Sequence, residues 1–188
     1  MKKIRAFLSL NLEDSVKFRI AEIQKELQTK LGGHLIKWEN PEKFHLTVRF
    51  LGDVKENDIE SLKDGLEKLN WDFESLKFTS NGVGFFPNAR KPNVVFIGLD
   101  EEGTGSKKLV DNIDKVLTEY GIQPDKKFVA HITLGRFRRE NRKSVDERDL
   151  VWFESFNVVF DSFYLMESVL DSKGSRHYPL KQFSFSKK

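Results

Sequence analysis

The sequence predicts an α+β protein in which two similar lobes enclose a central cleft. Short alternating segments, typical of strands, are separated by longer segments whose apolar residues have helical spacing. The order strand, helix, strand, helix occurs twice, at about 4–69 and 94–153. A motif of a histidine and a threonine two positions apart recurs in the corresponding strand of each copy. We therefore expect two lobes related by an approximate twofold axis.

The length of 188 residues suits a single domain over 1–188. We expect mostly antiparallel sheets around the cleft, with the helices on the outside. Two closing strands within 155–185 complete the predicted fold.

The first copy begins with an apolar strand, and its helices have apolar residues every three or four positions. Asp14 or Ser15 is the expected cap of the first helix, which Gly32 and Gly33 end. Gly52 is expected to close the motif strand. The predicted elements are strands at 4–12, 35–38 and 44–51 and helices at 14–31 and 57–69.

The second copy is preceded by a further strand and a loop that contains glycine and proline. A short helix and a pair of strands follow it. The predicted strands lie at 73–83, 94–99, 128–137, 158–168 and 178–185, the helices at 103–120 and 146–153, the loop at 84–88 and a basic turn at 138–143.

The two motifs are His45-Leu46-Thr47 and His131-Ile132-Thr133. Successive side chains of a strand point to opposite faces, so each histidine shares a face with its threonine. On the other face of the first strand we expect Leu46, Val48 and Phe50 to pack into the core. The lobe symmetry then places both motifs in one shared cleft.

Two imidazoles are suited to moving protons near neutral pH, because the unperturbed pKa of histidine is about 6.5. A neutral histidine can remove a proton from an attacking oxygen, and a protonated one can deliver a proton to a leaving oxygen. The residues alone do not decide which of His45 and His131 is the acid. Thr47 and Thr133 can donate hydrogen bonds to the oxygens of a phosphate.

Composition excludes several other functions. The chain has no cysteine, which excludes disulfides, zinc–thiolate sites and thiol nucleophiles. The net charge of +3 is compatible with an anionic partner. We expect no metal and no cofactor, because no acidic cluster with metal-ligand spacing accompanies the motifs. No apolar run suits a signal peptide or a membrane span, so a cytoplasmic protein is expected. The many Lys and Glu residues favour a thermophilic source.

The sequence resembles the RNA 2′,3′-cyclic phosphodiesterases, also called 2′-5′ RNA ligase-like proteins, of the two-histidine phosphoesterase superfamily. The resemblance covers nearly the whole chain and rests chiefly on two segments, 44–52 and 131–136. Supporting segments are 5–8, 82–87, 92–99 and 174–180. It implies a bilobal fold and hydrolysis of a 2′,3′-cyclic phosphate on RNA to a 2′-phosphate. It further implies that His45 is the proton donor and His131 the proton acceptor.

Arginines near the motifs are weaker candidates for binding phosphate or RNA. Arg49 and Arg136 are the expected substrate-binding arginines. Arg138, Arg139 and Arg142 are as compatible with a solvated basic face as with RNA contact. Three further candidates have mainly structural interpretations: the Phe85-Phe86 pair as core, and His34 and His177 as surface or structural residues.

Three functions are consistent with the sequence. The first is metal-independent hydrolysis of RNA 2′,3′-cyclic phosphate ends, with tRNA fragments as one such class of RNA. The second is 2′-5′ joining of RNA ends in the same cleft, in which a 5′-hydroxyl replaces water. The third is a nucleotide- or RNA-binding module without turnover, for which paired histidines are not needed. A monomer is expected in each case.

Overall fold

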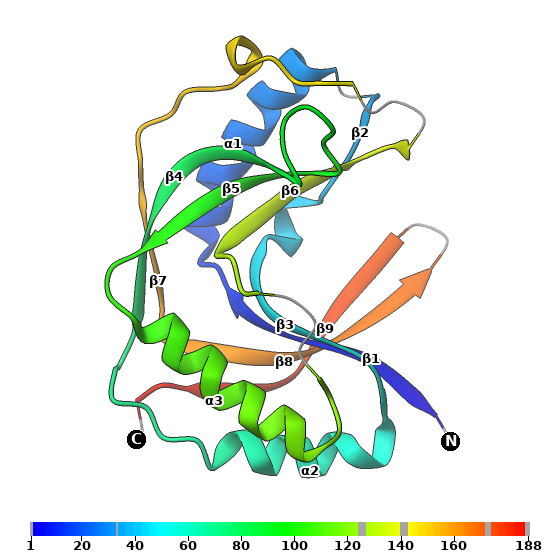
Figure 1. The fold of residues 1–188 in the computed structure, drawn as a ribbon, viewed down its shortest axis with the longest axis vertical. Helices are drawn as coiled ribbons and strands as arrows, with labels where there is room; N and C mark the ends of the chain where they lie inside the picture. The colour runs from blue at the N-terminus through cyan, green and yellow to red at the C-terminus, as the bar shows by residue number, and fades with distance from the viewer. Residues whose placement is uncertain (1, 33, 124–126, 140–142, 172–173, 187–188) are drawn as a thin grey trace.

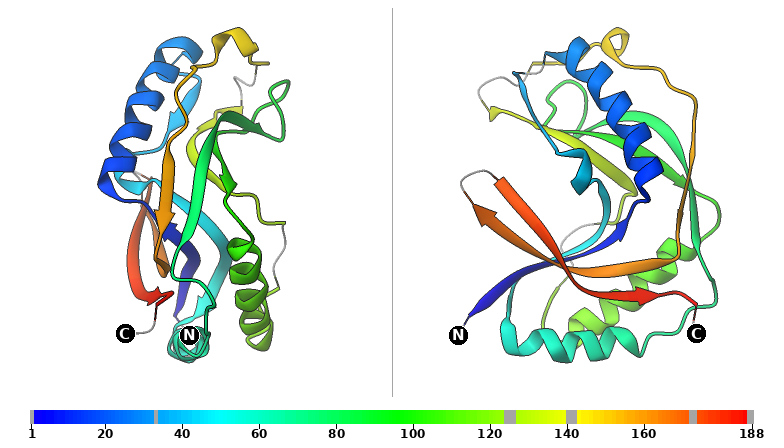
Figure 2. Two further views of the ribbon diagram at one scale, coloured as in Figure 1. Left: turned by 90° about the vertical axis from the view of Figure 1, so that its left-hand side faces the viewer. Right: turned by 180° about the vertical axis from the view of Figure 1, so that it is seen from behind.

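The computed structural model describes residues 2–32, 34–123, 127–139, 143–171 and 174–186, shown in Figures 1 and 2. Within them, nine strands form one curled, antiparallel sheet accompanied by three α-helices. The predicted α+β class with two lobes is confirmed. The elements are β1 (Lys3–Asn11), α1 (Asp14–Leu31), β2 (Ile36–Trp38), β3 (His45–Lys55), α2 (Glu56–Glu67), β4 (Leu76–Phe86), β5 (Val94–Glu101), α3 (Gly105–Glu119), β6 (His131–Phe137), β7 (Asn157–Phe160), β8 (Ser162–Asp171) and β9 (Gly174–Ser184).

The strand order of the sheet is symmetric about its centre. It runs β7-β4-β5-β6-β3-β1-β8-β9, with β2 paired to β6. The two motif strands, β3 and β6, are therefore neighbours in the middle. They pair at Leu46 and Ile132 and diverge on either side of this point, as Figure 1 shows. Each half of the sheet forms the wall of one lobe.

α1 and α3 each pack against the half of the sheet that does not contain the strand before them in the sequence. α1 follows β1 but lies beside the half that contains β6, where the Gln24 side-chain amide donates to the carbonyl oxygen of Leu134 at 2.9 Å. α3 follows β5 but contacts the other half, where Tyr120 at its end donates to the carbonyl oxygen of Ser61 at 2.7 Å. Each of the sequence segments 4–69 and 94–153 therefore contributes to both lobes.

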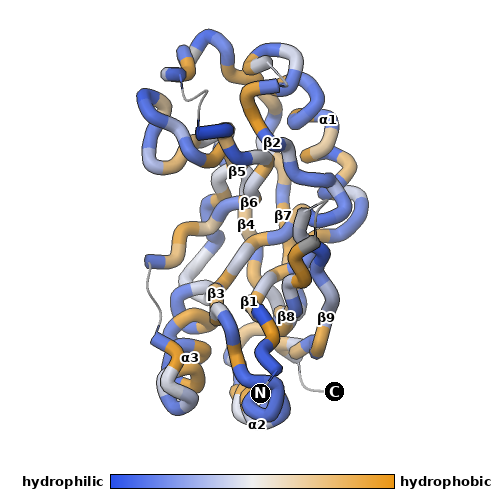
Figure 3. Tube along the Cα trace, turned by 90° about the vertical axis from the view of Figure 1, so that its right-hand side faces the viewer, coloured by the Kyte–Doolittle hydropathy of each residue, from blue (hydrophilic) through white to orange (hydrophobic). Residues whose placement is uncertain are grey.

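The core lies between the sheet and the inward faces of the helices. α1 buries Ile20, Ile23 and Leu27 at its expected helical spacing. Each such side chain contributes about 1.5–3 kcal/mol on burial. Apolar and polar positions are interspersed along the chain in Figure 3. No helix in the described ranges has the length and apolar composition that crossing a membrane requires.

Several predicted boundaries differ from the observed ones. β3 does not end at Gly52, which pairs with Ala6 inside the strand. Gly52 adopts a φ of 69°, so it bends the strand without ending it. Residues 84–86 belong to β4 and do not form a loop, because they pair with β5. The side chains of Asp14 and Ser15 do not cap α1, whose N-cap is Glu13 without a side-chain hydrogen bond.

The C-terminal third also differs from the prediction. The expected helix at 146–153 is only a 3₁₀ turn over Glu147–Asp149. The expected strand at 158–168 is two strands, β7 and β8, which pair with β4 and with β1 respectively. A change of partner strand cannot be read from hydrophobic alternation, which is the same on both sides of the break.

Phe50 is not part of the core. It is 63% exposed and lines the central cavity. The pairing of β3 with β1 skips Val48 and Leu51, so β3 contains two irregularities of the bulge type. An extra residue in a strand reverses the alternation beyond it. The expectation that Phe50 shares the buried face of Leu46 is therefore wrong.

Candidate active site

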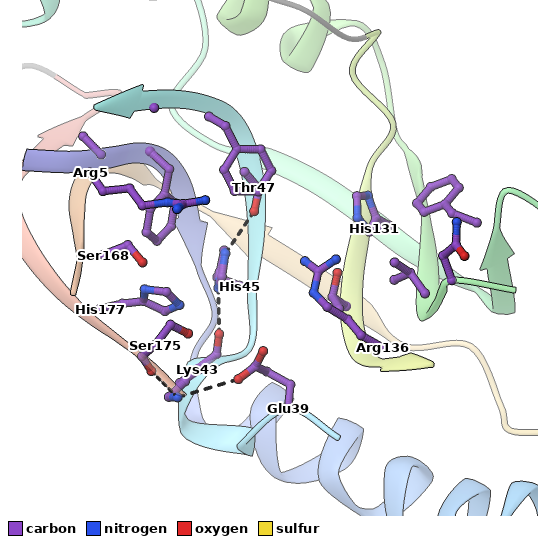
Figure 4. Close-up of a pocket in the computed structure, with 18 of the residues that line it drawn as sticks. Arg5, Glu39, Lys43, His45, Thr47, His131, Arg136, Ser168, Ser175 and His177 are labelled. Atoms are coloured by element: carbon purple, nitrogen blue, oxygen red, sulfur yellow. Dashed lines mark hydrogen bonds and ion pairs between the residues drawn. The ribbon is translucent and has the colours of Figure 1, made fainter. Parts of the chain in front are cut away.

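A cavity of about 730 Å³ lies between the two halves of the sheet. Its walls include all four motif side chains: His45, Thr47, His131 and Thr133. Figure 4 shows His45 and Thr47 on β3, with His131 on β6 across the gap. The cavity is large enough for a nucleotide with its phosphate.

The pairing at the centre of the sheet explains why both motifs share this cavity. Leu46 and Ile132 are directly opposite each other and are fully buried. Residues opposite each other on antiparallel strands project to the same face. The neighbours of both residues, the histidines and threonines, must then project to the other face, towards the cavity.

His45 is held by two hydrogen bonds. Its Nδ1 lies 2.7 Å from the carbonyl oxygen of Lys43, and its Nε2 lies 3.0 Å from Oγ1 of Thr47. A carbonyl oxygen can only accept a hydrogen bond, so Nδ1 carries a proton and is the donor of this bond. In the neutral imidazole, Nε2 is then the unprotonated nitrogen and accepts from the Thr47 hydroxyl. The ring also lies against Phe7, with ring centroids 5.2 Å apart.

His131 is held through Nδ1 in the same way. Its Nδ1 lies 2.7 Å from the carbonyl oxygen of Val129, two residues earlier. The ring packs at a steep angle against Phe86 and Phe96, with centroid distances of 4.9 and 5.3 Å. These contacts fix the ring with Nε2 as the unprotonated nitrogen of the neutral form. Such a nitrogen can accept a proton from a bound reactant.

Both histidines have lowered pKa values. Burial is the main cause for each, and it lowers the pKa of His45 to about 4. This value is the net result, in which the bond to the Lys43 carbonyl raises the pKa, the nearby His177 lowers it and the charge of Glu39 raises it. For His131, burial and then Arg136 lower the pKa, and the bond to Val129 raises it. Both rings are therefore neutral near pH 7 until an anion enters.

Of the two expected substrate-binding arginines, only Arg136 lines the cavity. Arg49 does not, because its guanidinium forms a bidentate pair with Asp114 of α3, at 2.7 and 2.8 Å. The side chains of this pair are only 11% and 23% exposed. Arg49 thereby ties α3 to the strand that carries His45, and its expected contact with substrate stays a prediction that this pairing does not favour.

The remaining candidates divide between the cavity and other surfaces. Arg138 and Arg139 are exposed and do not line the cavity, and Arg142 lies outside the described residues. Phe85 packs against the core, whereas Phe86 lines the cavity. His34 is exposed, as expected.

His177, expected as a surface or structural residue, is half-buried and lines the cavity. Its ring centroid lies 5.7 Å from that of His45. Arg5 and Lys43 also line the cavity without having been singled out. Arg5 and His177 lie in the segments 5–8 and 174–180, which carry part of the family resemblance. That resemblance was the sequence signal that could have identified them.

No group of three or more His, Asp or Glu suited to a metal ion occurs in the described part of the chain.

Comparison with known sequences gives consistent similarities. A family model described as LigT like Phosphoesterase matches residues 10–96 and 97–177. An RNA 2′,3′-cyclic phosphodiesterase from Archaeoglobus fulgidus is 34% identical over 181 residues, which cover 96% of this chain and 99% of that protein. A protein of the same name from Aquifex aeolicus is 28% identical, over 97% of this chain and 98% of its own length.

Solved structures are similar over the same extent. The crystal structure of TT0787 of Thermus thermophilus matches with a TM-score of 0.77 at 25% identity, over 97% of this chain and 98% of that one. Apo LigT of E. coli also matches with a TM-score of 0.77, at 20% identity, over 98% of both chains. The second similarity concerns the fold alone.

Proposed function

Because the chain belongs to the LigT-like phosphoesterase family, we propose that it hydrolyses the 2′,3′-cyclic phosphate at an RNA end to a 2′-phosphate. The observation that carries this proposal is the symmetric presentation of two imidazoles. Each is anchored through Nδ1 to a main-chain carbonyl, which leaves Nε2 for proton transfer in one cavity. A binding module would need the threonines and Arg136 but not this arrangement.

The phosphorus atom lies between the two histidines in the proposed complex. His131 Nε2 removes a proton from a water molecule, whose oxygen attacks the phosphorus. The bond from phosphorus to O3′ breaks, and His45 Nε2–H delivers a proton to O3′. The products are a 2′-phosphate and a free 3′-hydroxyl. The donor and acceptor roles follow the family resemblance, because the hydrogen bonds of Nδ1 are the same for both rings.

His45 can act as an acid only if it is protonated in the complex. The lowered pKa of His45 is caused chiefly by burial, which disfavours the charged imidazolium. A bound phosphodiester carries a negative charge and favours the imidazolium, so substrate binding raises the pKa of His45. Protonation of the acid is therefore coupled to the arrival of the substrate.

The Thr133 hydroxyl donates to a non-bridging oxygen of the phosphate. The Thr47 hydroxyl does the same once His45 is protonated, because Nε2 then no longer accepts from it. Arg136 adds a positive charge beside His131. These donors stabilise the charge that builds up on the oxygens in the transition state. The mechanism needs no metal ion, since the acid, the base and the anion donors are all side chains.

The test is the fate of a short RNA with a 2′,3′-cyclic phosphate end, followed by phosphorus NMR in the presence of EDTA. We expect conversion to the 2′-phosphate alone, at a rate that EDTA does not change. Production of a 3′-phosphate would show that the other bond breaks. Loss of turnover on chelation, restored by a divalent ion, would contradict the metal-free mechanism.

A further inference from the structure

A row of polar side chains crosses three adjacent strands on the His45 side of the cavity. Ser168 of β8 is directly opposite His177 of β9. Ala6 of β1 pairs with Glu167 of β8, so one residue further along the antiparallel ladder Arg5 faces Ser168. Arg5, Ser168 and His177 all line the cavity, and Figure 4 shows them grouped beside His45. The reaction described above does not use this row.

The row is suited to a negatively charged group. Among the described residues no carboxylate forms an ion pair with the Arg5 guanidinium. Burial lowers the pKa of His177, and the charge of Glu39 partly offsets this effect. Glu39 lies 3.8 Å from the ammonium group of Lys43, so much of its charge is balanced. Asp53 is the cross-strand neighbour of Arg5 on β3 but forms no ion pair with it, so the wall keeps the positive charge of Arg5 together with the hydroxyl of Ser168.

His177 adds a hydrogen-bond donor to this wall. Its Nδ1 is buried and has no hydrogen-bond partner. A buried N–H without an acceptor is costly, so the neutral ring carries its proton on Nε2. The ring is held by the edge of Phe7, with centroids 4.9 Å apart. This tautomer is the opposite of that in His45 and His131, so His177 donates a hydrogen bond where the other two accept one.

The assigned roles of the two histidines place the RNA on the His45 side of the cavity. In an in-line displacement the attacking water and the leaving O3′ lie on opposite sides of the phosphorus. If His45 protonates O3′, the ribose lies on the His45 side and the water lies on the His131 side. The chain of the RNA then leaves the ribose through its 5′-oxygen, along the wall that holds Arg5 and His177.

We propose that Arg5, Ser168 and His177 form a second phosphate subsite, which binds the phosphate on the 5′ side of the terminal nucleotide. The inference rests on the proposed function, because the position of the ribose follows from the role of His45. An RNA end carries this phosphate, whereas an isolated nucleoside 2′,3′-cyclic phosphate does not. The subsite therefore makes the enzyme prefer an RNA end to a free cyclic nucleotide.

The test compares the binding of adenosine 2′-monophosphate and adenosine 2′,5′-bisphosphate by titration calorimetry. Hydrogen bonds to a charged group are worth enough to make the bisphosphate bind about 10- to 100-fold more tightly to the unaltered protein. In Arg5→Met this ratio should fall to about threefold or less, and in His177→Phe it should fall part of the way. Arg5→Lys, which keeps the charge, should retain more of the ratio than Arg5→Met.

Arg90→Met is the matched control, because Arg90 is exposed and does not line the cavity. It removes the same charge and should leave the ratio unchanged. Equal affinity of the unaltered protein for both ligands would overturn the subsite, as would equal loss of the ratio in Arg5→Met and Arg90→Met. The ratio is a binding measurement, so it is independent of turnover. If cyclic phosphate is not hydrolysed but the ratio is present, the proposed reaction fails and the phosphate subsite stands.

Discussion

Nδ1 of His131 lies 2.7 Å from the carbonyl oxygen of Val129. The same distance separates Nδ1 of His45 from the carbonyl oxygen of Lys43. In both motifs the residue two positions before the histidine fixes the tautomer, so the strand itself prepares each ring for proton transfer through Nε2. The difference between the rings lies in their surroundings, and the first two predictions follow from it.

The pH dependence of turnover should differ between the free enzyme and the complex. Raising the pH removes the proton from the acid His45, and lowering it protonates the base His131, so both profiles are bell-shaped. Burial lowers both pKa values, and kcat/KM reports the free enzyme, so kcat/KM should peak below the ordinary histidine pKa of 6.5. The bound phosphate raises both pKa values, so kcat should peak at a higher pH. A kcat/KM that still rises above about pH 8 would contradict this assignment.

The stability of the folded protein should fall in acid, partly because of His45. Its pKa is about 4 in the folded state and 6.5 in the unfolded state, so the unfolded state binds the proton more readily between these values. This contribution is complete above pH 6.5 and is lost as the pH falls towards 4. Between near pH 7.5 and near pH 4.5 it amounts to about 2–3 kcal/mol.

Urea unfolding of His45→Gln at these two pH values measures the contribution. Glutamine does not titrate, so the variant should lose less stability in acid than the unaltered protein. The remaining loss includes His131 and His177, whose pKa values are lowered in the same direction. An equal loss of stability in both proteins would mean that His45 is not held neutral by burial.

Thr47→Val should impair turnover without affecting the fold. Valine keeps the shape and the preference for a strand but removes the hydroxyl that bonds His45 Nε2 at 3.0 Å. Loss of one hydrogen bond to a charged phosphate costs about 1.5–3 kcal/mol, so kcat/KM should fall about 10- to 100-fold. Thr79→Val is a suitable control, because Thr79 is also on a strand but does not line the cavity. A similar fall in both variants would remove the special role of Thr47.

Arg49→Met should affect stability more than substrate binding. The guanidinium is paired with Asp114 and largely buried, so its removal leaves a carboxylate without its partner. We expect a loss of about 2–3 kcal/mol in unfolding free energy, less than for a fully buried pair. Lys2→Met breaks the exposed pair with Glu56 and should cost much less stability than Arg49→Met. A large rise in KM with unchanged stability would instead indicate that Arg49 contacts the substrate.

The motif strands were predictable because two independent patterns agree there: the alternation of apolar and polar residues, and the repeated pair of a histidine and a threonine. Alternation over 44–48 and over 130–134 places the histidines and threonines opposite Leu46 and Ile132, and both predicted faces match the observed burial. Helical periodicity likewise located α1, α2 and α3 to within a few residues. Local patterns predict local structure when nothing interrupts them.

Phe50, Arg49 and His177 show the limits of such reasoning. Phe50 follows a bulge, and bulges depend on how β3 matches β1, which the sequence of β3 alone does not contain. Arg49 pairs with Asp114, which is 65 positions away in the sequence, on α3. α3 packs against the half of the sheet that does not contain β5, the strand before it. His177 is not followed by a threonine two residues later, so it is not part of a His-x-Thr motif. Only the pairing of β8 with β9 brings it to the cavity.

The most direct test of paired acid–base catalysis is the turnover number of His45→Ala and His131→Ala on a 2′,3′-cyclic nucleotide, with His34→Ala as the control. His34 is exposed and does not line the cavity, so its replacement should leave kcat unchanged. General acid–base assistance is worth about 10²–10⁴-fold, and each of the two motif variants should lose about that much in kcat. Because the two histidines act in one displacement, the double variant should be less impaired than the product of the single losses. Turnover at the unaltered rate in either His45→Ala or His131→Ala would contradict the account.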